Sequence, residues 1–125
     1  EEAGRVRVGS GKVEIGQGAV TALAQIAAEE LDVAFAQLRV ISGETWISPS
    51  EKFTTGSDTI VYSGAAVRLV CAEVRALLLA RAAEKLGCDE IVMGTRGHTA
   101  LTDFLIGSTV TRVVHLTKTP VLLVK

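Results

Sequence analysis

The spacing of apolar residues changes along the first half of the chain, and each change predicts a different element. Polar and apolar side chains alternate over residues 4–8, which is typical of a short, half-buried strand. Over residues 19–31 the apolar side chains recur every three or four positions, so we expect an amphipathic helix there. Residues 38–41 predict a second strand. The order is therefore strand, glycine-rich loop, helix and strand.

A long polar segment and a long helix follow. Residues 42–57 show no periodicity, and they exceed the length of an ordinary connection, so this loop is functional or belongs to a larger context. Asp58 predicts a helix cap, and apolar residues at helical spacing continue to Leu86, after which Gly87 ends the helix. A helix that starts at Asp58 would be longer than a small sheet is thick. It therefore overhangs in its first turns or begins later, near Ser63.

The last part of the chain repeats the alternation of strands and helices. We expect a strand over residues 91–93, a glycine-containing loop over 94–106, a helix over 107–116 and a strand over 121–124. The last strand is apolar throughout, which predicts that both of its faces are covered. Strands that alternate with helices predict an α/β fold with a parallel sheet.

Composition agrees with one soluble domain and excludes several classes of function. The 125 residues are 48% hydrophobic and 22% charged, which is sufficient for one buried core. The net charge of -1 and the aromatic content of 4% disfavour a nucleic-acid partner. No apolar run approaches the ~18 residues that span a bilayer, and the first residues do not resemble a signal peptide, so we expect no membrane contact and a cytoplasmic location. Cys71 and Cys88 lack the spacing of a metal site, and we expect both to be free thiols.

A glycine motif stands in the C-terminal third of the chain. It reads glycine, two residues, glycine, nine residues, glycine and serine, and with its flanking strands it makes residues 82–125 similar to the universal stress protein family. The resemblance implies a loop that binds the phosphates of ATP or a related nucleotide, with or without magnesium. Bare backbone and a helix N-terminus favour an anion, although the same glycines could only form turns and the serine only cap its helix. The candidate nucleotide-binding residues are Gly94, Arg96, Gly97, Gly107, Ser108 and Thr109, with Gly9 and Ser10 from the first loop.

The first glycine-rich loop supports a second resemblance. The run GKVEIGQG from Gly11 to Gly18, the helix after it and the sequence Thr55-Gly56-Ser57 make residues 6–87 similar to the molybdenum-binding subunit of the xanthine dehydrogenase and aldehyde oxidase family. In that family a Gly-Gln-Gly loop approaches the molybdenum centre, so the resemblance implies that Gln17 faces the cofactor. The segments that complete the metal site in that family are absent from this sequence. We therefore expect no molybdenum cofactor and no oxidative hydroxylation.

The two resemblances meet near residues 82–87, and together they predict an engineered or recombined chimera. If the third strand lies beside the first, as in universal stress proteins, the single Rossmann-like domain has an open, mostly parallel four-stranded sheet with strand order 2-1-3-4 and helices on both faces. We expect this domain to bind a nucleotide without strong catalysis. The alternatives are a structural chimera without a ligand and a fragment that binds a molybdopterin nucleotide. Because an apolar edge strand invites pairing, we expect a homodimer through Val121–Val124.

Overall fold

The computed structural model describes residues 4–94 and 108–124, and it divides the chain into two compact units, Glu1–Cys71 and Ala72–Lys125. The elements in chain order are β1 (Val6–Ser10), α1 (Ala19–Leu31), a 3-10 helix (Phe35–Gln37), β2 (Leu38–Ser42), a π-helix (Thr59–Gly64), α2 (Ala65–Leu86), β3 (Ile91–Gly94), α3 (Ser108–Leu116) and β4 (Val121–Val124). The alternation of helices and strands predicted from the sequence is confirmed. A single domain for the whole chain stays a prediction.

The long helix is the element whose start the sequence left open. A π-helical segment follows Asp58, and the α-helix begins only at Ala65, close to the later of the two predicted starts. At the other end Gly87 takes a left-handed backbone conformation with a φ of 65°, which glycine adopts without strain. The N–H of Cys88 then donates to the carbonyl of Ala83 at 2.9 Å, which closes the helix end. The predicted helix end at Gly87 is confirmed.

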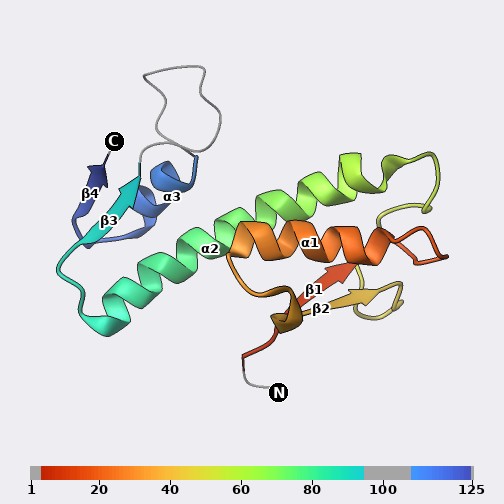
Figure 1. The fold of residues 1–125 in the computed structure, drawn as a ribbon, viewed down its shortest axis with the longest axis horizontal. Coiled ribbons are helices and arrows are strands. Elements are labelled where there is room, and N and C mark those ends of the chain that lie inside the picture. Colours follow the sequence, from red (N-terminus) through yellow and green to blue (C-terminus); the bar gives the residue numbers. More distant parts are fainter. Residues whose placement is uncertain (1–3, 95–107, 125) are drawn as a thin grey trace. The chain divides into compact units, whose positions relative to one another are not determined.

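The strands form two separate parallel pairs, so the predicted four-stranded sheet with strand order 2-1-3-4 and helices on both faces is wrong for the described residues. β1 pairs with β2 from Val6 opposite Leu38, and β3 pairs with β4 from Ile91 opposite Val121 (Figure 1). Each pair lies within one compact unit. Hydrophobic spacing indicates that a segment is a strand, but the spacing does not depend on which other strand it pairs with. The pairing between the first and third strands therefore had no support in the sequence itself.

The core of the first unit lies between α1, the β1–β2 pair and the start of α2. Figure 1 shows α1 running along the two strands. The buried side chains of this core are Leu23, Ala27, Leu31, Val67 and Cys71, and partly buried Val6, Val8, Ile26, Val33 and Leu38 pack against them. Burial, and to a smaller extent the carboxylate of Glu30, raise the pKa of the Cys71 thiol. Cys71 is therefore a packed, neutral thiol, as its position on the helix predicts.

The second unit is built from the C-terminal part of α2, the β3–β4 pair and α3. Val113 is fully buried, and Ala76 and Val110 are buried as well. β4 is covered on one face only, because Leu122 and Val124 remain 48% and 49% exposed. The prediction that both faces of this strand are covered is therefore wrong. In the part of the chain that the structure describes, no helix has the length and apolar character needed to cross a membrane.

Leu23 tests whether the first core holds its unit together. Leu23 is completely buried, so Leu23→Ala removes apolar contacts and leaves a cavity, and it should lower the free energy of unfolding by about 2–5 kcal/mol. Leu69 on α2 is 52% exposed, and Leu69→Ala should cost less than about 1 kcal/mol. Urea denaturation followed by circular dichroism measures both values. Equal losses for the two variants would contradict this description of the core.

Candidate functional site

The loop of residues 11–18 connects β1 to α1. We call it the glycine-glutamine loop. Gly16 and Gly18 have φ angles of 97° and 75°, a backbone conformation that other residues rarely adopt. A Cβ atom added to either glycine would meet nothing within 4 Å. The glycines are thus required by the path of the backbone, and the space above them is available to a ligand.

Gln17 stands between these glycines, and its side-chain amide is held at both ends. Its Nε2 donates to the carbonyl of Val13 at 2.8 Å, and its Oε1 accepts the N–H of Ile15 at 2.7 Å. A primary amide has two N–H donors and two oxygen lone pairs. Beyond these two bonds, the exposed amide can offer one N–H and one lone pair to a ligand. The loop therefore presents an oriented donor and acceptor.

Glu14 supplies the cap of α1. The N-cap residue Gly18 has no side chain with which to accept a hydrogen bond from the first turn of the helix. The Glu14 carboxylate does so instead, because it accepts the N–H of Val20 at 3.1 Å and the N–H groups of Gly18 and Gly16 at 2.9 Å each. The positive end of the helix is therefore already occupied by an anionic group of the chain itself.

The same hydrogen bonds set the charge state of Glu14. The N–H groups of Val20 and Gly18, with a smaller contribution from Gly16, stabilise the ionised carboxylate and hold its pKa below the ordinary value of a glutamate. A carboxylate with a depressed pKa stabilises the folded loop above its unfolded pKa. This stabilisation is lost as the pH falls through the folded pKa. The cap is therefore present at neutral pH and is lost in acid.

A buried lysine ties a second segment to the glycine-glutamine loop. Residues 43–58 form what we call the long loop, and the Lys12 side chain, only 3% exposed, donates from Nζ to the carbonyls of Glu51 at 2.9 Å and Phe53 at 3.0 Å. The hydroxyl of Ser10 donates to the Glu51 carboxylate at 2.9 Å. A Cβ on Gly11 would collide with the carbonyl oxygen of Pro49. The two loops are therefore in direct backbone contact, which only glycine at position 11 permits.

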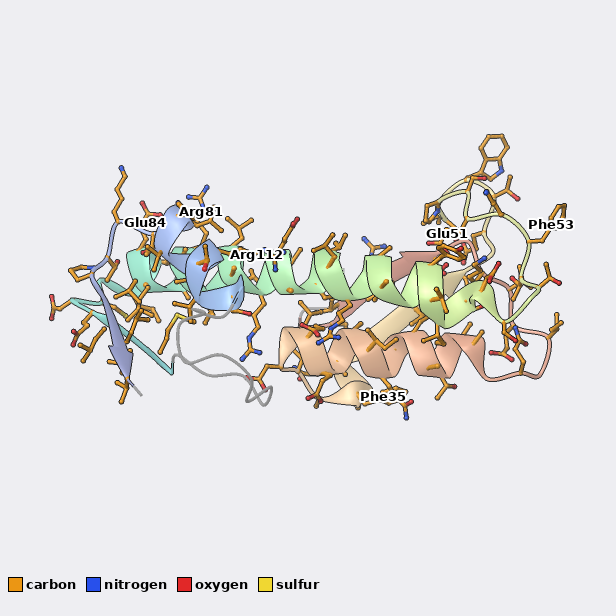
Figure 2. The ribbon with its side chains drawn as sticks, turned by 90° about the horizontal axis from the view of Figure 1, so that it is seen from above. Phe35, Glu51, Phe53, Arg81, Glu84 and Arg112 are labelled. Atoms are coloured by element: carbon orange, nitrogen blue, oxygen red, sulfur yellow. The ribbon has the colours of Figure 1, made fainter. Side chains whose placement is uncertain are left out.

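The long loop also carries exposed aromatic side chains. Trp46 is 97% exposed and Phe53 is 86% exposed. Figure 2 shows the Phe53 ring pointing away from the loop. The backbone of this loop is thus anchored by Lys12, while its two largest apolar side chains are presented to the outside.

The residues predicted to bind a nucleotide lie in both units. Ser10 ends β1 completely buried, and its hydroxyl is used by Glu51 and by the N–H of Lys12. Its role in the structure is to join β1 to the long loop. Gly9 precedes it on the same strand, Gly94 ends β3, and Ser108 and Thr109 begin α3. Arg96, Gly97 and Gly107 lie outside the described residues.

Sequence reasoning missed Lys12, Glu14 and Glu51. For Glu14 there was a usable signal, because a helix that starts after Gly18 needs its cap from another residue. For Lys12 and Glu51 there was none, since their partners lie about forty residues away in a segment without periodicity. Within the described residues no group of three or more His, Cys, Asp and Glu side chains could hold a metal ion.

Comparison with known proteins shows the family. The molybdopterin cofactor-binding domain matches residues 1–117, and the chain belongs to this family. The chain is 40% identical over 85 residues to a nicotinate dehydrogenase subunit of Pseudomonas putida, which is 68% of this chain and 7% of that protein. It is 39% identical over 66 residues to the gamma subunit of the 6-hydroxypseudooxynicotine dehydrogenase complex of Paenarthrobacter nicotinovorans, which is 53% of this chain and 8% of that protein. The chain therefore spans less than a tenth of each of these relatives.

These findings correct the function predicted from the sequence. A nucleotide-binding chimera of the universal stress protein type, its ligand-free alternative and ATP as the ligand are wrong, because the molybdopterin family covers residues 1–117 and so includes most of the segment 82–125. The expectation of no molybdenum cofactor is wrong for the same reason. The physical cause of the error is that glycines and a serine before a helix also form turns and caps in proteins that bind no nucleotide. The resemblance of the first loop to molybdenum-binding subunits is confirmed.

The titration of Glu14 tests the cap. We expect the Glu14 carboxyl to titrate below the ordinary range of a glutamate, and the amide signals of Gly16, Gly18 and Val20 to shift with the same midpoint. Nuclear magnetic resonance over the acid range measures both. In Glu14→Gln the shared midpoint should disappear from the three amides. A Glu14 carboxyl that titrates like a glutamate in an unfolded peptide, or above it, would contradict the cap.

Proposed function

We propose that this chain forms part of the binding site for a molybdenum cofactor in a dehydrogenase subunit, and that Gln17 is the residue that contacts the cofactor. The observation that carries the proposal is the oriented amide of Gln17 on an open loop, in a chain that belongs to the molybdopterin cofactor-binding domain family. When bound, the cofactor supplies the redox chemistry of the dehydrogenation.

The residues of the glycine-glutamine loop fit such a group. Gly16 and Gly18 leave open space on both sides of Gln17, so a large planar ligand can approach the backbone without meeting a Cβ. The remaining N–H of the Gln17 amide is a donor suited to an oxygen acceptor, and it is neutral at every accessible pH. The loop can therefore position a hydrogen bond whose strength does not depend on the protonation of the donor.

Glu14 adds to the specificity of this site. Its carboxylate occupies the N-terminus of α1, where an anionic group of a ligand would otherwise be favoured. A phosphate at that position would have to displace the carboxylate and would be repelled by its charge. We therefore assign the cofactor contact to the neutral side chain of Gln17, which directly precedes the N-cap residue Gly18.

We also propose that the chain acts within a larger assembly. Both relatives are named as subunits, one of them of a complex, and each is more than ten times longer than the matched segment. Trp46 and Phe53 are among the exposed apolar side chains that such an assembly could cover. Pairing of two copies through Val121–Val124 stays a prediction, and the feature that favours it is the edge of β4 that pairs with no other strand within the described residues.

Replacement of Gln17 tests the proposed function. The chain is produced in cells that synthesise the molybdenum cofactor, and molybdenum is measured by elemental analysis and pterin by its fluorescence. Gln17→Ala removes one hydrogen bond to the cofactor and should lower its affinity about 10-fold, so that less molybdenum is retained at limiting cofactor. Gln25 is an exposed glutamine on α1, and Gln25→Ala is the matched control, which should retain as much as the wild type.

Two results would contradict the proposal. Absence of molybdenum and pterin from the wild type would remove the cofactor from this chain. Equal retention in Gln17→Ala and Gln25→Ala would keep the cofactor but remove Gln17 as its contact.

A further inference from the structure

Gln17 is connected to the long loop through Val13. The Val13 N–H donates to the hydroxyl oxygen of Thr54 at 2.8 Å, and the Val13 carbonyl accepts the Gln17 Nε2 at 2.8 Å. We propose that Thr54 is a positioning residue for the Gln17 amide, acting through Val13. This inference deepens the proposed function and rests on it, because it concerns the residue that is assigned to the cofactor.

Thr54 can act in this way because the chain just before it is fixed. The Lys12 ammonium binds the carbonyls of Glu51 and Phe53, and a buried ammonium keeps such partners because it would otherwise be left without acceptors in an environment that excludes water. Phe53 immediately precedes Thr54. The backbone that leads into Thr54 is therefore anchored by the Lys12 contacts.

Val13 lies next to two residues of the long loop, Gly43 at its start and Thr54 near its end. Thr54 near its end accepts the Val13 N–H, and Gly43 at its start lies so close to the Val13 side chain that a Cβ there would be 3.1 Å from Cγ2. Gly43 is itself fixed, because its N–H donates to the carbonyl of Ser10 at 3.1 Å. Because its N–H is bonded to Thr54, Val13 is restrained in turning its carbonyl.

The direction of that carbonyl determines where the Gln17 amide points. One Nε2 hydrogen is directed at the Val13 carbonyl, and the planar amide then fixes the direction of the second hydrogen. A rotation of Val13 would turn the free N–H away from the position that the loop gives it. Thr54 thus sets the direction of the donor without touching the ligand.

A pair of variants separates positioning from general stability. Thr54→Val keeps the shape of the side chain and removes the acceptor, whereas Thr54→Ser keeps the hydroxyl. In the full chain, nuclear magnetic resonance follows the Gln17 Nε2 hydrogen that is bonded to the Val13 carbonyl, and the Val13 amide hydrogen. We expect Thr54→Val to speed their exchange with solvent about five-fold, the effect of losing one hydrogen bond, and Thr54→Ser to restore the wild-type rates. Core amides such as Leu23 should exchange as in the wild type.

The outcomes are distinct. Faster exchange at Val13 with an unchanged rate for the bonded Gln17 hydrogen would overturn the proposal, and so would equal behaviour of the valine and serine variants. If the core amides of Thr54→Val also exchange faster, the result for Thr54→Ser decides. Wild-type exchange rates in Thr54→Ser would attribute the change to loss of the hydroxyl, and altered rates in Thr54→Ser would overturn the proposal. These measurements need no cofactor. A wild type that binds no molybdenum would therefore refute the proposed function while leaving the link between Thr54 and Gln17 measurable.

Discussion

The contact on which the candidate site depends is the buried ammonium of Lys12, which binds the carbonyls of Glu51 and Phe53. An ammonium group is removed from water only where polar partners replace the lost hydration. Here the partners are backbone carbonyls of the long loop, which has no regular secondary structure over most of its length. One lysine ammonium therefore holds in place a segment that no helix or strand hydrogen bonds stabilise. Lys12 adjoins Val13, and the same contact therefore restrains the glycine-glutamine loop.

Two carboxylates complete this arrangement in different ways. Glu51 is joined to Ser10 at the end of β1, which ties the long loop to the sheet. Glu14 caps α1, because its carboxylate accepts the N–H groups of Gly18 and Val20, and this contact joins the glycine-glutamine loop to the start of the helix. Gln17 is thus exposed but oriented, because its amide is hydrogen-bonded to the backbone of Val13 and Ile15. A site built in this way can hold a neutral donor in place before any ligand arrives, which lowers the entropy lost on binding.

The sequence predicted the features that depend on near neighbours. α1 was correctly placed at residues 19–31, and Gly87 was correctly identified as the end of α2, because helical spacing and a left-handed glycine are local signals. Strand pairing was not predictable, since β1 and β3 show no preference for a partner in their own residues. The role of Lys12 was hidden for the same reason, as its acceptors are 39 and 41 residues away. Gln17 became a candidate for the cofactor contact by resemblance to a family and not by spacing, and this role stays a proposal.

Hydrogen exchange in Lys12→Met tests the central claim most directly. Methionine keeps the length and apolar stem of the side chain but cannot donate to the two carbonyls, so exchange should accelerate about 10-fold or more in residues 11–18 and 43–58 together. The matched control is Lys52→Met, because Lys52 is an exposed lysine on the same loop. Mass spectrometry of exchanged peptides measures both segments in one experiment. Unchanged exchange in residues 11–18 of Lys12→Met would show that the glycine-glutamine loop does not depend on this contact.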